Sequence, residues 1–268
     1  MARTESATAP ALRLSPRSLV MVVIAGVTSL VAFGWPLLVN PSSAVGTHEL
    51  APLLLVLVVP LVLAVVTAEV TGDRADVKAL AMLGVLSAVV AVVRPLGGGT
   101  AGLETVFLPI IIAGRVFGPG FGFVLGNTGL FASALITGAI GPWLPYQMLA
   151  SGFVGLLAGV LPQLRGRIEL VMLAGFSFVA AFVYGWLIDF SFWPFTVGTD
   201  TQISYQPGAP AWQNLQRFFW FNVATSMGWN LGRALTTMLL LVVLGPAFLR
   251  ILRRAARRAS FTSQPFEE

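Results

Sequence analysis

The stretch that decides the fold is Leu103–Leu164, which reads LETVFLPIIIAGRVFGPGFGFVLGNTGLFASALITGAIGPWLPYQMLASGFVGLLAGVLPQL. It is almost wholly apolar, yet glycine and proline recur in it at positions that the helices of a soluble core would not tolerate. In a membrane, small residues let helix backbones approach closely, because packing rather than the expulsion of water drives helix association. The stretch therefore predicts several short, tightly packed spans with sharp turns at Gly118-Pro119-Gly120 and Gly141-Pro142.

The composition of the 268-residue chain is that of a helical membrane protein. Hydrophobic residues make up 56% of it and charged residues 10%, whereas soluble domains carry about 25% charged residues. Apolar runs of about 20 residues recur along the chain, long enough to cross a bilayer as helices. The period-two alternation of a β-barrel does not appear. We therefore expect an all-α, polytopic bundle in the cell membrane.

Eight spans are predicted along the chain. They are Ser18–Val39, Ala51–Val70, Ala79–Val93, Thr105–Phe117, Phe121–Gly138, Pro145–Leu161, Glu169–Phe192 and Arg217–Leu249, with a polar outer loop at Thr196–Gln213. The fourth is short for a full crossing. A cleaved signal peptide is the alternative reading of the first, but its apolar run is longer than a usual signal core and no small-x-small cleavage site follows it closely.

These spans divide the chain into three parts. Residues 1–76 form an N-terminal tail with two extra spans, residues 77–250 form a six-helix core, and residues 251–268 form a basic tail. The distribution of Lys and Arg predicts that both termini are cytoplasmic. The inner loops and tails would hold Arg3, Arg13, Arg17, Arg74, Lys78, Arg115, Arg165, Arg167 and the C-terminal arginines, while the outer loops hold His48, Glu49, Glu104 and Asp200. Only Arg94 and Arg217 fall at outer ends. The C-terminal cluster can also hold anionic membrane lipid.

The motifs of the common enzyme classes are missing from the chain. It has no cysteine and a single histidine, His48, which excludes disulfides, thiol catalysis and clusters of cysteine or histidine metal ligands. It contains no G-x-x-x-x-G-K-[ST], H-E-x-x-H or G-x-S-x-G motif. Its basic residues flank the spans instead of alternating with aromatic residues, which argues against nucleic-acid binding. We therefore expect no catalytic residue, no metal and no cofactor, and a protein that is not an enzyme.

Polar side chains inside membrane spans are costly and are therefore candidates for a binding site. The last span contains five that follow spacings of three, four and seven: Asn222, Ser226, Trp229, Asn230 and Arg233. Such spacing predicts one helical face, turned toward a ligand chamber that opens to the outside. In the alternative reading, the asparagines bond neighbouring helices and Arg233 pairs with an internal acid.

Further candidates lie near the outer ends of other spans. They are Tyr184, Trp186 and Asp189 on the seventh span, Trp143, Tyr146 and Gln147 after the Gly141-Pro142 turn, and Asn127 on the fifth span. The aromatic residues would also fit an interfacial belt. Asp189 would otherwise pair with Arg94 or Arg217 across the outer rim, and Asn127 would bond a neighbouring backbone.

The third span carries a stripe of small residues. Gly84 and Ala88 lie four residues apart, and Ala81 and Ala91 adjoin the same face. This small-xxx-small pattern is typical of close helix contacts in membranes. The stripe packs either inside the bundle or against another membrane protein.

From about Val77 to the C terminus the chain resembles the S components, the substrate-binding membrane subunits of energy-coupling factor (ECF) vitamin transporters. The resemblance is carried by Gly84-x-x-x-Ala88, by LPIIIAGRVFGPGFGFVLGNTG at residues 108–129 and by GPWLPYQMLASGFVGLLAGVLP at residues 141–162. It implies a six-helix core made of the third to eighth spans. The first two spans are then additions to the usual plan.

The resemblance also implies a function. Such a subunit binds a vitamin or vitamin precursor from outside and docks on a transmembrane coupling subunit, which two cytoplasmic ATPases drive, and it then topples in the membrane to release the substrate. The docking face would be the small residues of the first core helix, Ala81, Gly84 and Ala88. Carried over by position, the outer pocket would comprise Glu104, Trp143, Gln147, Tyr184, Asp189, Asn222, Trp229 and Asn230.

The substrate itself is not identified by any motif. The aromatic and amide content of the expected pocket suits a flat or amide-bearing ligand, such as a corrinoid or a thiamine-like heterocycle. The alternative function is a self-sufficient secondary transporter or channel for a small organic solute. Carriers of that kind often contain inverted repeats, and no clear repeat relates the two halves of this chain.

Overall fold

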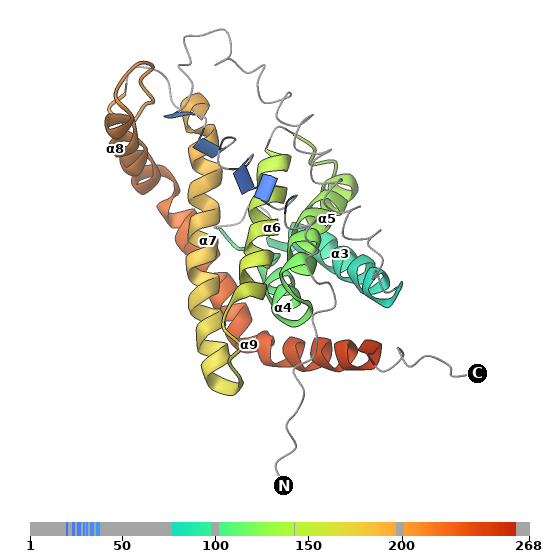
Figure 1. The fold of residues 1–268 in the computed structure, drawn as a ribbon. Coiled ribbons are helices and arrows are strands. Elements are labelled where there is room, and N and C mark those ends of the chain that lie inside the picture. Colours follow the sequence, from blue (N-terminus) through green and yellow to red (C-terminus); the bar gives the residue numbers. More distant parts are fainter. Residues whose placement is uncertain are drawn as a thin grey trace, which may run out of the picture.

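A computed structural model describes residues 77–97, 102–141, 143–196 and 201–260, together with isolated positions between 20 and 37. These parts of the chain are built from helices and contain no strand (Figure 1). The helices are α3 (Val77–Gly97), α4 (Phe107–Phe117), α5 (Pro119–Thr137), α6 (Leu144–Val160), α7 (Gly166–Thr196), α8 (Ala211–Phe221), the π-helical segment η2 (Asn222–Ser226) and α9 (Met227–Ser260). Because α8, η2 and α9 follow one another without a break, the core has six helical segments, which confirms the predicted all-α bundle.

Within the described residues, four segments are long and apolar enough to cross a membrane. They are Lys78–Gly97, Pro119–Thr137, Gly166–Pro194 and Ala211–Arg257. The other two, α4 and α6, are shorter, with 11 and 17 residues. At 1.5 Å per residue, α4 extends for about 16 Å, roughly half of a hydrocarbon layer of about 30 Å. The prediction that this segment is too short for a full crossing is therefore confirmed.

The glycines of the decisive stretch allow α4, α5 and α6 to pack backbone against backbone. A Cβ atom on Gly122 of α5 would overlap the carbonyl oxygen of Gly155 on α6, and a Cβ on Gly155 would overlap that of Gly122. Gly114 of α4 faces the same carbonyl group of Gly155. Any larger residue at these positions would separate the helices, which confirms the reading of the glycines as a helix-packing surface.

The two predicted N-terminal spans fall largely outside the described residues, and Ala51–Val70 does so entirely. The described positions between 20 and 37 are helical. Among them, Phe33 is buried and its ring packs edge-on against that of Tyr146, with 5.4 Å between centroids. Where it is described, the first predicted span therefore packs on α6.

The last helix continues past the expected end of its span. Pro246 lies inside α9, and a proline removes one backbone hydrogen bond and kinks the helix. Figure 1 shows the C-terminal part of α9 lying across the end of the bundle where α7 begins. Leu249 and Leu252 are buried in the main core there. Residues 251–260, which the sequence suggested were part of a tail, thus belong to a helix that packs under the bundle.

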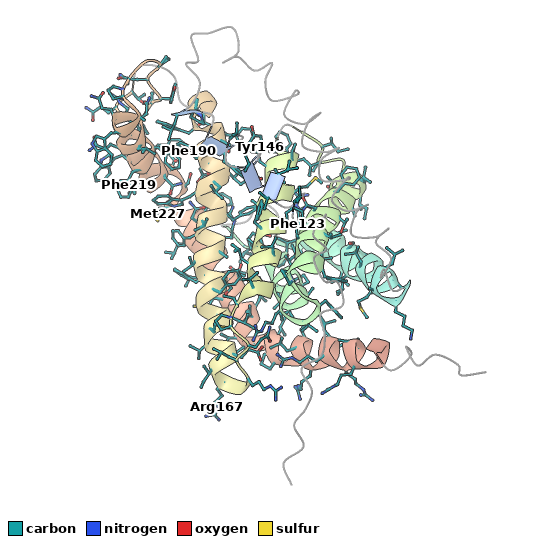
Figure 2. All side chains as sticks on the ribbon, in the orientation of Figure 1. Phe123, Tyr146, Arg167, Phe190, Phe219 and Met227 are labelled. Atoms are coloured by element: carbon teal, nitrogen blue, oxygen red, sulfur yellow. The ribbon has the colours of Figure 1, made fainter. Side chains whose placement is uncertain are left out.

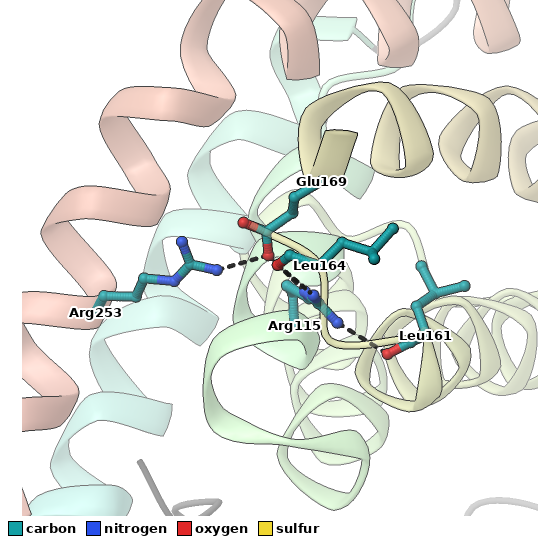
Figure 3. Close-up of polar contacts among 5 residues, drawn as sticks. All are labelled: Arg115, Leu161, Leu164, Glu169 and Arg253. Atoms are coloured by element: carbon teal, nitrogen blue, oxygen red, sulfur yellow. Dashed lines mark hydrogen bonds and ion pairs between the residues drawn. The ribbon is translucent and has the colours of Figure 1, made fainter. Parts of the chain in front are cut away.

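A buried cluster of charges fixes this end of the bundle (Figure 3). Oε1 of Glu169, on α7, accepts hydrogen bonds from Nε of Arg115 on α4 at 2.7 Å and from Nη2 of Arg253 on α9 at 2.6 Å. Arg115 also donates to the carbonyl oxygens of Leu161 and Leu164, at 2.9 and 3.2 Å. The cluster joins α4, the loop before α7, α7 and α9. Arg115, which the charge pattern assigned to an inner loop, is instead buried within a helix, where these acceptors satisfy its guanidinium group.

Candidate functional site

The candidate site begins with an ion pair between a loop and the last helix. Glu104 lies in the loop between α3 and α4, and its Oε2 is 3.7 Å from Nε of Arg233 on α9. Each of the two side chains is 19% exposed. Burial raises the pKa of the Glu104 carboxyl group, and the nearby Arg233 opposes that rise. Arg233 therefore has the internal acid that its position in an apolar span requires.

A glycine holds the loop of Glu104 against α9. Gly102 has a φ of 74°, in the left-handed region that favours glycine. A Cβ atom at this position would overlap the backbone carbonyl oxygen of Trp229. The loop backbone can therefore lie directly on α9, and this contact brings Glu104 within reach of Arg233.

Four side chains form a polar cluster where α7 meets η2 and α9. Nδ2 of Asn222 donates to Oδ2 of Asp189 at 2.7 Å, and Nδ2 of Asn230 lies 3.3 Å from the same oxygen. Nδ2 of Asn230 is also 3.3 Å from Oδ1 of Asn222, while Nη1 of Arg233 donates to Oδ1 of Asn230 at 2.8 Å. Both asparagines are buried. Asp189 is thus linked through amides to the Glu104–Arg233 ion pair.

The alternative reading of Asp189, a pairing with Arg94 or Arg217 across the outer rim, is not what the described residues show. Arg217 donates to the backbone carbonyl oxygens of Thr201 and Gln202, and Arg94 donates to Oε1 of Gln147 at 2.7 Å. Asp189 is instead stabilised by neutral amide donors.

The π-helical segment explains how two asparagines eight residues apart reach one carboxylate. In an unbroken α-helix, eight residues advance by about 800°, which leaves roughly 80° between the two side chains. One extra residue in a turn, as in a π bulge, rotates the following helix back by about 100°. Asn222 and Asn230 then lie nearly in line, and both contact Asp189.

Because of the same rotation, the prediction that the polar residues of the last span share one helical face is wrong for Trp229. Trp229 turns away from the asparagines, and its side chain is 45% exposed whereas Asn230 is buried. Hydrophobic periodicity assumes 3.6 residues per turn throughout and therefore places Trp229 with the asparagines. Figure 2 shows the side chains on the ribbon around this region, with Met227 at the start of α9.

The remaining predicted residues divide into two groups. Tyr184 is buried, with its ring edge-on to Phe107 at 4.9 Å and its centroid 5.3 Å from the guanidinium carbon of Arg233, a cation–π distance. Gln147 is bonded to Arg94, whose charge also acts on Glu104. Trp143, at the start of α6, is 42% exposed and, like Trp229, has no bond to this network in the described chain.

Gly185 also belongs to the site and was not among the residues predicted from the sequence. A Cβ atom on Gly185 of α7 would overlap Oδ1 of Asn230 and lie 2.5 Å from Nη1 of Arg233. The missing side chain therefore provides the space in which these two groups meet. The only signal in the sequence is a glycine directly after Tyr184 in an apolar span.

Two hollows border α8. The larger, of about 870 Å³, is lined by polar and aromatic residues that include Trp212, Gln213, Arg217 and Trp220. The other, of about 610 Å³, lies between α7 and α8 and is apolar, with Trp186 among its lining residues. None of the eight predicted site residues lines either hollow. Within the described residues, no group of three or more His, Cys, Asp or Glu side chains could hold a metal ion.

Comparison with known proteins identifies the family. A family model described as "ECF transporter, substrate-specific component" matches residues 78–251, a region that includes α3 to α8 and most of α9. No curated protein and no solved structure matches the chain. The matched region contains the whole polar network, and the family is a transporter component rather than an enzyme. The chain belongs to the substrate-specific components of ECF transporters, and it is a multi-pass membrane protein that forms the substrate-binding subunit of such a transporter.

Proposed function

We propose that this subunit captures a vitamin or vitamin precursor from outside the cell and docks on a transmembrane coupling subunit that two cytoplasmic ATPases drive. In this proposal the two ends of the bundle have different roles. The end that carries the Glu104–Arg233 pair faces outward, and the end that carries Arg115 and Glu169 faces the cytoplasm with both termini. Residues 77–250 bind the substrate, while residues 1–76 add two spans.

The polar network is the observation that carries the proposal. Its members come from four separate segments, the loop before α4, α7, η2 and α9, and they meet at one place although ionisable groups are costly in a membrane. Groups that both donate and accept hydrogen bonds in a low-dielectric setting are typical of small-molecule sites.

The chemistry of the network suggests a substrate class. The carboxylates of Asp189 and Glu104 accept hydrogen bonds, Arg233 donates them, and the ring of Tyr184 offers a flat apolar face. Nε of Arg233 has no hydrogen-bond partner among the described residues, although Glu104 lies 3.7 Å away. These groups fit a ligand with a flat ring and polar nitrogen or amide substituents, so a corrinoid or a thiamine-like molecule remains our proposal.

The exposed face of α3 supports the proposed docking site. Ala81, Gly84 and Ala88 are exposed, and a Cβ atom on Gly84 would meet no described atom within 4 Å. Ala91, which the sequence placed on the same face, is buried instead. A partner helix can therefore approach the backbone of α3 closely at Ala81, Gly84 and Ala88, but not at Ala91.

Mass spectrometry of small molecules released from the purified subunit tests the proposal. We expect one vitamin-like compound in near-stoichiometric amount from the wild type and much less from Asn230→Ala, with Gln216→Ala on the exposed side of α8 as the control. Equal amounts from the wild type and Asn230→Ala would show that the network is not the binding site. Thermal unfolding of each variant confirms that it is folded.

A further inference from the structure

The part of α9 after Pro246 has one exposed face that carries only positive charges. Leu249 and Leu252 point into the core, while Arg250, Arg254 and Arg257 are exposed. The spacing of four and three places the arginines on one side of the helix. No acidic residue occurs from Pro246 to Ser260, so nothing in this segment offsets their charge.

The neighbouring Arg253 already has an acidic partner. Nη2 of Arg253 donates to Glu169 at 2.6 Å, and Glu169 is also bonded to Arg115. In the described ranges, by contrast, Arg250, Arg254 and Arg257 form no ion pair, and the one bond of Arg250 is to the carbonyl oxygen of Pro246. The buried cluster holds the helix in place and leaves three cations facing away from the bundle.

The position of this helix matches that of an interfacial helix. It lies across the end of the bundle where α7 begins, near Arg167 in Figure 2. Its buried leucines share a core with Phe117 of the short membrane helix α4. Ile251, 63% exposed, lies beside Arg250 and Arg254. An amphipathic helix with arginines and an exposed apolar residue at the edge of the hydrocarbon layer is suited to anionic headgroups, which attract such basic clusters.

We propose that the face formed by Arg250, Arg254 and Arg257 binds the phosphate groups of anionic phospholipids in the leaflet adjoining this end of the bundle. The bound lipid holds the part of α9 after Pro246 against α4 and α7. This role is independent of the substrate, so it stands or falls separately from the proposed function. An acidic surface of a partner protein is the competing occupant.

The test measures thermal unfolding of the full-length protein in neutral detergent with added phosphatidylglycerol or phosphatidylcholine. At about ten times the dissociation constant, phosphatidylglycerol should raise the midpoint of the wild type by about 3 to 6 °C, and phosphatidylcholine should not. The shift should shrink in high salt. It should disappear in Arg250→Gln/Arg254→Gln/Arg257→Gln and persist in the matched triple lysine variant, which keeps the charge.

A second measurement guards against a variant that is merely less stable. Mass spectrometry counts the phosphatidylglycerol molecules that co-purify with each protein, and we expect fewer on the triple glutamine variant than on the triple lysine variant. The proposal is overturned if the triple glutamine variant keeps the full shift and the lipid, or if phosphatidylcholine acts equally. It is also overturned if neither lipid has an effect and the variant instead fails to assemble with the ATPases, because the face then binds protein.

Discussion

Asn222 donates a 2.7 Å hydrogen bond from Nδ2 to Oδ2 of Asp189, and this bond joins the π-helical segment to α7. Both residues lie in apolar helices, where an unpaired carboxylate would be strongly unfavourable. The π turn rotates the helix that follows it and so brings Asn230 to the same carboxylate. The site is therefore built by an irregularity of the helix.

Replacing Asn222 by alanine should destabilise the protein and weaken ligand binding. Hydrogen bonds to charged groups contribute about 1.5–3 kcal/mol, so a drop of several degrees in the thermal midpoint is expected. The control is Gln216→Ala, an exposed amide of α8, which should change stability by no more than about 0.5 kcal/mol. Equal midpoints for the two variants would mean that the bond to Asp189 contributes nothing.

Gly185 and Gly175 provide a matched pair on α7. A Cβ atom on Gly185 would overlap Asn230, whereas a Cβ on Gly175 would meet nothing within 4 Å. We expect Gly185→Ala to cost about 1–3 kcal/mol and to reduce the retained ligand. Gly175→Ala should be neutral or stabilising by up to about 1 kcal/mol, because alanine favours helix more than glycine does. Thermal unfolding and ligand retention measure both, and a tolerated alanine at 185 would refute the close contact.

The cluster at the other end of the bundle should respond unequally to the loss of its members. The side chains of Arg115 and Glu169 are 0% and 2% exposed, and that of Arg253 is 39% exposed. Glu169→Gln leaves Arg115 buried without its counter-charge, which should cost about 3–5 kcal/mol. Arg253→Gln should cost about 1 kcal/mol or less, because water screens that pair. A larger loss from Arg253→Gln in thermal unfolding would reverse our ranking.

The small-residue face of α3 gives a prediction about assembly. In Gly84→Leu/Ala88→Leu, the added side chains should prevent the close approach of a partner helix while the network on α7 and α9 remains intact. We expect co-purification with the coupling subunit to be lost and ligand binding to be kept. Val179→Leu/Val183→Leu, on the exposed side of α7, is the control and should assemble normally. Assembly of the α3 variant at the wild-type level would place docking elsewhere.

Regular features of this fold could be predicted from the sequence. The positions and lengths of the apolar runs located α3 to α7 to within a few residues, because membrane helices are apolar almost all round and end at polar, glycine or proline residues. The glycine stretch predicted close packing, and Gly122 and Gly155 provide it. The pairing of Arg233 with an internal acid was only the alternative reading of the last span, and Glu104 is the acid that meets it.

Irregular features could not be predicted in the same way. The π turn at Asn222–Ser226 leaves no mark in hydrophobic periodicity, so Trp229 was assigned to the wrong face. Glu169 accepts hydrogen bonds from both Arg115 and Arg253. These three residues lie far apart in the chain, so no local sequence pattern connects them. The distribution of positive charge placed Arg115 in an inner loop, but Arg115 is buried in helix α4.

Transport in proteoliposomes tests the central claim most directly. The subunit is reconstituted alone or with its coupling subunit and ATPases, and uptake of the co-purified compound is measured with and without ATP. We predict that the subunit alone binds the compound without concentrating it, and that accumulation requires both the partners and ATP. Accumulation of the compound by this subunit alone, against its gradient, would contradict the account.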